Sequence, residues 1–250
     1  MKKKAMVAVS AAVCASMLLS ACGSSSSTST TAAPAETTAA EAKAEDTTAA
    51  AGPAASGDVV TINIGFENTT EEPIGQAVEK WAELLKEESN GTMELKVFAN
   101  SALGNKSKLI DQMVMGENVI TIADGAFYAD YGVPDLGILY GPFFFDNWDE
   151  VWKLIDSDWY KEQCSKLADK GLTVLGSNWI YGERELMTKD KAVVPADIKG
   201  KKIRLANSQI YVEGFNALGA TAVPMALGDV YTALQNGTLD GVENLLSTLY

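Results

Sequence analysis

The chain has 250 residues, of which 47% are hydrophobic and 21% charged, a composition typical of globular proteins. Its 33 acidic and 20 basic residues give a net charge of -13, so the basic surface of a nucleic-acid-binding protein is missing. Histidine is absent, which excludes Ser-His and Cys-His nucleophilic pairs and the commonest zinc ligand. We therefore expect no cofactor, no metal and no nucleic-acid partner.

The first 22 residues have the pattern of a bacterial secretion signal. Three lysines at 2–4 precede an apolar run at 5–19, which is short for a membrane span. The run ends in Leu-Ser-Ala-Cys22, which resembles the bacterial lipobox, whose cysteine receives diacylglycerol. We expect a lipoprotein signal peptide at 1–21 and a lipid on Cys22, which would anchor the protein to the outer face of the cell membrane. An ordinary signal peptide is the alternative.

Residues 22–58 are expected to form a flexible tether. Ser, Thr, Ala and Gly dominate this stretch, which is too poor in large apolar side chains to pack. A random coil of this length reaches about 30 to 35 Å. Cys14 would leave with the signal peptide and Cys22 would be acylated, so Cys164 alone would remain, without a disulfide, as a packing residue on its helix.

The folded part alternates strand and helix patterns. Val60, Ile62, Ile64 and Phe66 alternate with smaller or polar residues, which predicts a strand with one apolar face. Pro73 then begins an amphipathic helix that Asn-Gly at 90–91 ends. Next come a strand at 93–99, a helix at 106–115, a strand at 119–123, helices at 148–156 and 159–170, and a strand at 173–180.

A second set of elements follows. We expect strands at 184–188, 202–206, 221–225 and 240–246, with helices at 210–218 and 227–236. Such alternation predicts an α/β protein with mostly parallel sheets flanked by helices. We place a first domain at 59–181 and a second at 182–250.

In open α/β sheets ligands bind at the carboxyl ends of the strands. Asp124 precedes a glycine, so its side chain has an alternative role in capping the next turn, and Trp179 has an alternative role in the core. The polar and aromatic residues near strand ends are Glu67, Asn68, Asp124, Trp179, Arg184, Asn207 and Asn244.

Three stretches carry a resemblance to a known family. GKKIRLAN at 200–207, IYVEGFNALGA at 210–220 and DVYTALQNGTLDGVEN at 229–244 resemble the DctP-type receptors of TRAP (tripartite ATP-independent periplasmic) transporters. The resemblance extends back through Pro142-Phe143 and Leu103-Gly104 to the first strand. It implies a two-domain clamshell of the periplasmic-binding-protein type, which closes on an organic acid and delivers it to membrane subunits driven by an ion gradient. Such a protein is not an enzyme.

The resemblance also implies the site. Arg204 matches the family arginine that forms a salt bridge with the ligand carboxylate, Arg184 matches a second arginine, and Asn244 matches an asparagine that hydrogen-bonds the carboxylate. Asp124 and Glu67 match variable polar contacts, and carboxylates there would suit the hydroxyl groups of a hydroxylated acid. From the residues alone, Arg204 has the alternative of pairing with a surface acid, and Arg184 that of pairing with Glu183 or Glu185.

Several expectations concern the whole protein. Family members continue well beyond position 250, so the second domain is expected to be incomplete at its C-terminus. We expect a monomer, and the bound acid stays open among C4-dicarboxylates, sugar acids and oxo acids. The alternatives are a receptor of an ATP-driven uptake system, a surface lipoprotein without a transport role, and an extracytoplasmic enzyme with paired carboxylates, although no acid–base spacing supports the last.

Overall fold

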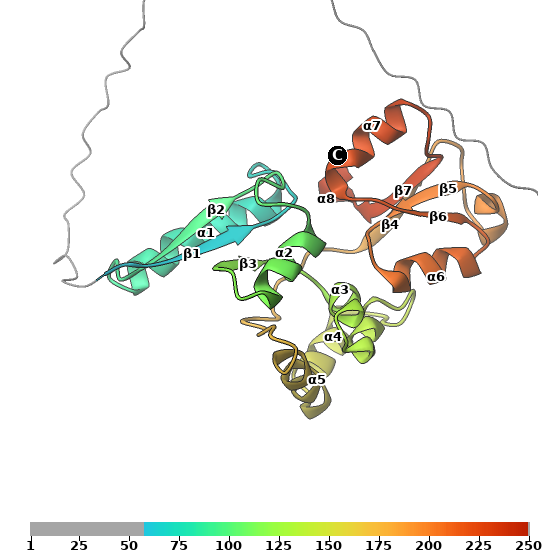
Figure 1. Cartoon of the computed structure of the whole chain (residues 1–250). Coiled ribbons are helices and arrows are strands. Elements are labelled where there is room, and N and C mark those ends of the chain that lie inside the picture. Colours follow the sequence, from blue (N-terminus) through green and yellow to red (C-terminus); the bar gives the residue numbers. More distant parts are fainter. Residues whose placement is uncertain (1–57, 250) are drawn as a thin grey trace, which may run out of the picture. The chain divides into compact units, whose positions relative to one another are not determined.

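The computed structural model describes residues 58–249 (Figure 1). The predicted signal peptide, the lipidation site Cys22 and the tether as far as residue 57 lie outside the described residues. Between residues 58 and 249, no helix combines the length and the apolar character needed to cross a membrane.

The alternating residues after Val60 form the central strand of a three-stranded parallel sheet with the order β2-β1-β3. Ile64 and Phe66 are buried and pack with Val78 of the following helix and Leu95 of β2. Pro73 begins that helix, where its missing N–H removes no helical hydrogen bond. The elements are β1 (Val60–Gly65), α1 (Pro73–Glu88), β2 (Met93–Phe98), α2 (Lys106–Val114) and β3 (Val119–Thr121).

A group of helices follows β3 and packs around Leu136 and Leu167. The side chains of Asn147 and Ser157 accept hydrogen bonds from the first turns of two of these helices, as N-cap residues do. The helices predicted at 148–156 and 159–170 are confirmed within two residues at each end. The elements are α3 (Gly125–Asp130), the 3₁₀ helix η1 (Pro134–Tyr140), α4 (Trp148–Ile155) and α5 (Asp158–Ala168).

The strand predicted at 173–180 is wrong. Residues 172–183 are neither strand nor helix, and none of the strand pairings in the described part involves them. Alternation supplies only the side-chain pattern of a strand, whereas a strand also requires a neighbour whose backbone groups bond to its own. Leu175 and Ile180 are exposed here.

The second sheet has four strands in the order β4-β7-β5-β6. The pairings β5–β6 and β5–β7 are parallel, and β4–β7 is antiparallel. The predicted α/β class with mostly parallel sheets is therefore confirmed, while the domain boundary at 181/182 stays a prediction. The elements are β4 (Arg184–Thr188), η2 (Pro195–Ile198), β5 (Lys202–Leu205), α6 (Gln209–Ala217), β6 (Thr221–Pro224), η3 (Leu227–Asp229), α7 (Val230–Gln235), β7 (Gly241–Leu245) and α8 (Leu246–Leu249).

The strand register divides the polar residues of the second sheet between its two faces. Arg204 of β5 lies opposite Val242 of β7, and Arg184 of β4 lies opposite Leu245 of β7. Because successive residues of a strand point to opposite faces, Arg204 shares a face with Asn244, and Arg184 shares the other face with Glu243. Helix α6 covers this second face, where Tyr211 packs with Ile203 and Leu205.

Candidate functional site

Arg204 lies near the end of β5 with only 3% of its surface exposed. Its Nε and Nη2 atoms donate to the carbonyl oxygen of Met225 at 3.0 and 2.8 Å, and Nη1 donates to that of Glu243 at 3.4 Å. In the described part of the chain, no carboxylate lies within 4.0 Å of the guanidinium. The alternative of a surface ion pair for Arg204 is therefore not seen in this structure.

The surroundings of Arg204 disfavour its charge. Burial lowers the pKa of Arg204, and the positive charge of Arg184 lowers that pKa further, while Glu243 and Glu67 partly offset these effects. An arginine guanidinium nevertheless stays protonated in proteins. Arg204 is therefore a buried cation held by carbonyl oxygens alone, and a carboxylate placed against it would be stabilised.

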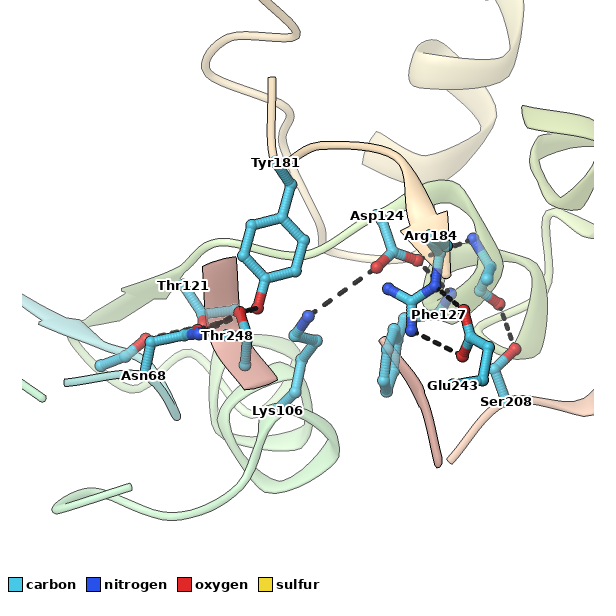
Figure 2. A network of polar contacts seen from close by, with 12 residues as sticks. Asn68, Lys106, Thr121, Asp124, Phe127, Tyr181, Arg184, Ser208, Glu243 and Thr248 are labelled. Carbon is cyan, nitrogen blue, oxygen red and sulfur yellow. Dashed lines mark hydrogen bonds and ion pairs between the residues drawn. The ribbon is translucent and has the colours of Figure 1, made fainter. Parts of the chain in front are cut away.

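Arg184 has a different environment. It donates from Nε and Nη2 to the two carboxylate oxygens of Glu243, the latter at 2.8 Å (Figure 2). Its guanidinium carbon lies 4.9 Å from the ring centroid of Tyr211, within cation–π range. Burial is the largest single effect on the pKa of Arg184 and lowers it, but the hydrogen bond to Glu243 together with the electrostatic effects of Tyr211, Glu243 and Asp124 outweighs burial and raises the pKa. The partner of Arg184 is thus Glu243 rather than Glu183 or Glu185.

Asp124 caps α3, as the alternative interpretation of this residue predicts. Its Oδ1 atom accepts from the backbone N–H groups of Ala126 at 3.1 Å and Phe127 at 3.4 Å. The other oxygen, Oδ2, lies 3.7 Å from Nζ of Lys106 (Figure 2). One carboxylate oxygen therefore caps the N-terminus of α3, and the other faces the ammonium of Lys106.

Lys106 was missed by the sequence analysis. It is the first residue of α2, after the N-cap Asn105, whereas the residues predicted from the sequence lie near the carboxyl ends of strands. Its Nζ lies 4.8 Å from the ring centroid of Phe127 and 5.7 Å from that of Tyr181. The nearby Leu103-Gly104 motif was the signal that could have directed attention to it.

A small space brings several predicted residues together. It has a volume of about 10 Å³, which is room for about one water molecule. Arg204, Glu67 and Asn207, all predicted from the sequence, face the same space, and Lys106 joins them. The full lining is Glu67, Asn105, Lys106, Ser107, Phe127, Arg204, Ala206, Asn207, Met225 and Ala226.

The other predicted residues do not line this space. Asn244 is buried in β7, on the same face of the sheet as Arg204. Trp179 packs edge-to-face on Trp81 with ring centroids 5.7 Å apart. It lines a separate space of about 310 Å³, together with Glu72, Ile74, Tyr181, Thr248 and others.

Asn68 joins segments that are distant in the sequence. Its Nδ2 atom lies 2.7 Å from Oε2 of Glu72. The same atom lies 2.9 Å from the hydroxyl of Tyr181 and 3.4 Å from Oγ1 of Thr248 (Figure 2). Asn68 therefore has a structural role in this conformation.

Within residues 58–249, no group of three or more His, Cys, Asp or Glu side chains could hold a metal ion.

Comparisons with known proteins identify the family. The family model DctP, described as "Bacterial extracellular solute-binding protein, family 7", matches residues 64–250. A solute-binding protein of Chromohalobacter salexigens is 33% identical over 181 residues, covering 69% of this chain and 51% of that protein.

Solved structures of TRAP periplasmic solute-binding proteins share the fold. One from Ochrobacterium anthropi, with bound L-fuconate, is 41% identical with a TM-score of 0.74, covering 77% of this chain and 64% of that one. One from Actinobacillus succinogenes, with bound L-galactonate, is 37% identical with a TM-score of 0.73, covering 76% and 63%. The chain thus spans about half to two thirds of the length of these relatives. This family consists of transport receptors rather than enzymes, and the chain belongs to it: the DctP family of bacterial extracellular solute-binding proteins.

Proposed function

We propose that this chain is an extracytoplasmic receptor that binds a small organic acid through Arg204 and delivers it to a TRAP-type membrane transporter. The observation that carries the proposal is the state of Arg204, which is buried, charged and held only by carbonyl oxygens. Family membership supports the transport role. The pairing of a guanidinium with a carboxylate supports the ligand class, because the planar donors of arginine match the two carboxylate oxygens.

Asn244 and Arg184 are two further predicted contacts to the acid in the proposed binding site. Asn244 lies on the same face of the second sheet as Arg204, so its amide is a candidate to bind the carboxylate from the side. Arg184 uses two of its N–H groups on Glu243. Because a guanidinium has five N–H donors, this leaves others for a ligand, and its role as a second contact stays a prediction.

The size of the site implies that the receptor must open to take up its ligand. A space of about 10 Å³ beside Arg204 holds about one water, whereas small-molecule sites are usually hundreds of cubic ångströms. We therefore propose that the elements carrying Glu67 and Lys106 separate from those carrying Arg204 and Asn207 when an acid enters. This opening is the reverse of the closing movement expected of a clamshell receptor.

The acids bound by similar proteins support the proposed ligand class. L-fuconate and L-galactonate are bound in the two solved structures described above, and both are sugar acids. For this chain we propose a small carboxylate from the set of sugar acids, C4-dicarboxylates and oxo acids. The partners would be the integral membrane subunits of the transporter.

We further propose that a lipid on Cys22 holds the receptor at the membrane as a monomer. The support is the lipobox-like sequence that ends at Cys22. Growth of the expressing bacterium with labelled palmitate tests this point. Label should enter the wild-type chain and be absent from Cys22→Ser, whereas label in both would contradict lipidation at this residue.

Ligand binding tests the main proposal. Isothermal titration of the chain with L-galactonate, L-fuconate, succinate and pyruvate should detect at least one acid, and neutral L-fucose should not bind. Arg204→Ala should abolish that binding, since removing one partner of a buried charge pair costs about 2 to 5 kcal/mol. Lys202→Ala, at an exposed position of the same strand, is the matched control and should bind normally. Equal affinity in Arg204→Ala and wild type would contradict the proposal.

A further inference from the structure

One segment of this acidic chain is basic. Five lysines and two aspartates give residues 189–202 a charge of +3, which leaves -16 on the rest of a chain whose net charge is -13. We call the surface that carries these lysines the lysine patch. Its members are Lys189, Lys191, Lys199, Lys201 and Lys202.

Backbone hydrogen bonds bring the two ends of this segment together. Asp240, just before β7, accepts from the backbone N–H of Lys189 at 3.0 Å and donates to the carbonyl oxygen of Lys202 at 2.8 Å. Its carboxylate also accepts from the N–H of Lys202 at 2.8 Å. Nζ of Lys201 lies 2.7 Å from Oδ2 of Asp190. The segment is therefore a closed loop at the end of the second sheet where β5 and β7 begin.

The nearby aspartates do not neutralise the lysine patch. Asp190 pairs with Lys201, and with Asp190, Asp197 and Asp240 all counted the five lysines still leave a charge of +2. Among the described residues, no carboxylate oxygen lies within 4.0 Å of the ammonium groups of four exposed lysines, Lys189, Lys191, Lys199 and Lys202.

Two exposed valines lie in the same loop. Oδ2 of Asp197 accepts from the backbone N–H groups of Val193 at 2.8 Å and Val194 at 3.1 Å, which fixes the chain where it enters η2. Ile198, at the other end of η2, is buried in the core. The valine side chains instead point outward, with 71% and 53% of their surfaces exposed. Aliphatic side chains beside lysines suit a membrane surface, where the ammonium groups meet anionic headgroups and the apolar groups enter the interface.

We propose that the lysine patch, with Val193 and Val194, is a contact surface for a bilayer that contains anionic lipids. Charge complementarity favours this occupant, because such a bilayer attracts the patch and repels the remaining surface of the chain, and so orients the protein. Arg204 bonds to the carbonyl oxygen of Met225, just beyond the end of β6, whereas the patch lies where β5 and β7 begin. The contact would therefore leave the proposed acid site free, and the inference goes beyond the proposed function.

The reactivity of individual lysines tests this contact. The full chain is mixed with vesicles of phosphatidylcholine alone or of an equal mixture with phosphatidylglycerol, and mass spectrometry measures how fast acetic anhydride modifies each lysine. On the anionic vesicles the four exposed patch lysines should react at least about fivefold more slowly than on the neutral vesicles. Raising the salt concentration should remove this protection, because salt screens exposed charges.

Exposed lysines elsewhere in the same molecule are internal controls. Their rates should differ by less than about twofold between the two kinds of vesicle, since they lie outside the proposed contact. Binding of vesicles through residues 1–57 does not by itself select the patch, because the comparison is made within one chain. The control lysines are Lys86, Lys96, Lys108 and Lys153.

A charge-matched pair of variants separates the patch from the net charge. Lys191→Glu with Lys202→Glu changes the charge of the patch from +2 to -2 and leaves Lys189 and Lys199 as probes. Protection of these two probes on anionic vesicles should fall to the level of the internal controls. Lys86→Glu with Lys108→Glu makes the same change in net charge elsewhere and should preserve the protection. Equal urea midpoints confirm that both variants fold.

The outcomes decide between a lipid contact and its alternatives. Protection that is confined to the patch in wild type, lost in the patch variant and kept in its control supports the proposal. Equal rates on both kinds of vesicle, or equal slowing of patch and control lysines, would overturn it. Patch protection that appears only when the vesicles carry the transporter's membrane subunits would identify a protein-docking surface and would also overturn the lipid contact. None of these results depends on which acid the chain binds.

Discussion

Arg184 and Glu243 form a bidentate ion pair diagonally across the antiparallel strands β4 and β7. The register sets Arg184 opposite Leu245, two residues beyond Glu243, so both side chains lie on the face that α6 covers. Diagonal neighbours on one face of a sheet are within reach of long side chains. Tyr211 of α6 closes over the guanidinium, and the pair is therefore shielded from water on that side.

Removing the charge of Glu243 should destabilise the fold. The Glu243 side chain is 6% exposed and that of Arg184 is 18% exposed, so Glu243→Gln leaves a largely buried cation without a counter-charge. We expect a loss of about 3 kcal/mol in the free energy of unfolding, measured by urea denaturation. Adding Arg184→Met should restore much of this loss. Glu83→Gln, which breaks the exposed pair with Lys80, is the control, and an equally small effect of both substitutions would contradict the expectation.

Gly125 should not tolerate a side chain. A Cβ atom there would lie 2.3 Å from the carbonyl oxygen of Leu136, closer than non-bonded carbon and oxygen atoms can approach. Gly125 directly follows Asp124, the N-cap residue of α3. Gly125→Ala should lower the free energy of unfolding by roughly 1 to 3 kcal/mol. Gly228→Ala is the control, because a Cβ at that position meets no atom within 4 Å. Indistinguishable urea midpoints for the two variants would refute this prediction.

Tyr160 should contribute to a loss of stability at high pH. Burial raises the pKa of Tyr160 to about 12, although its hydrogen bond to Ser177 acts in the opposite direction, whereas an unfolded tyrosine ionises near pH 10. Between these values the unfolded chain releases a proton that the folded chain retains. Stability is therefore fully present below about pH 10 and falls as the pH rises toward 12.

The variant Tyr160→Phe isolates this contribution. At pH 8 it should lose about 1 kcal/mol with the 2.7 Å hydrogen bond to Ser177, a typical value for one bond. Above pH 10 its stability should fall less steeply than that of wild type, by up to about 1.4 kcal/mol per pH unit. Urea titrations at a series of pH values measure both effects, and identical slopes would argue against the raised pKa.

Cys164 should react slowly in the folded protein. Burial raises the pKa of its thiol, which the contact with Tyr160 only partly offsets, and the side chain packs against the cluster around Leu136 and Leu167. Because the thiolate is the reactive form, alkylation by iodoacetamide at pH 8 should be at least about tenfold slower than in denaturing urea. Mass spectrometry of the Cys164 peptide gives both rates, with glutathione as the control for the effect of urea. Equal corrected rates would exclude a protected thiol.

Local features were largely readable from the sequence. The alternation after Val60, the proline that begins α1 and the carboxylate of Asp124 before Gly125 each specify a short-range structure, and each is found as predicted. Such features depend on neighbours a few residues away, so periodicity and capping chemistry are sufficient to find them. Arg204 was identified by a family motif, and its burial fits that assignment, although its ligand contact stays a prediction.

Interactions between residues that are distant in the sequence could not be predicted from the sequence. The residues of the Arg184–Glu243 pair are 59 positions apart, and the adjacent Glu183 and Glu185 were equally plausible partners until the register of β4 and β7 was known. Lys106 lies at the start of a helix and meets Asp124 only because α2 and the end of β3 come together in the fold. The segment 173–180 failed as a strand for the same reason, since pairing depends on a neighbouring strand.

The sequence by itself determined the α/β class and most of the order of strands and helices, because these follow from local periodicity. Its family motif singled out Arg204 as the arginine expected to bind a carboxylate. Only the tertiary structure decided which charges neutralise one another. It paired Arg184 with Glu243, set Lys106 against Asp124, and left Arg204 held by carbonyl oxygens. Strand register and helix packing set these distances, and the strength of an electrostatic interaction depends on distance and burial rather than on separation along the chain.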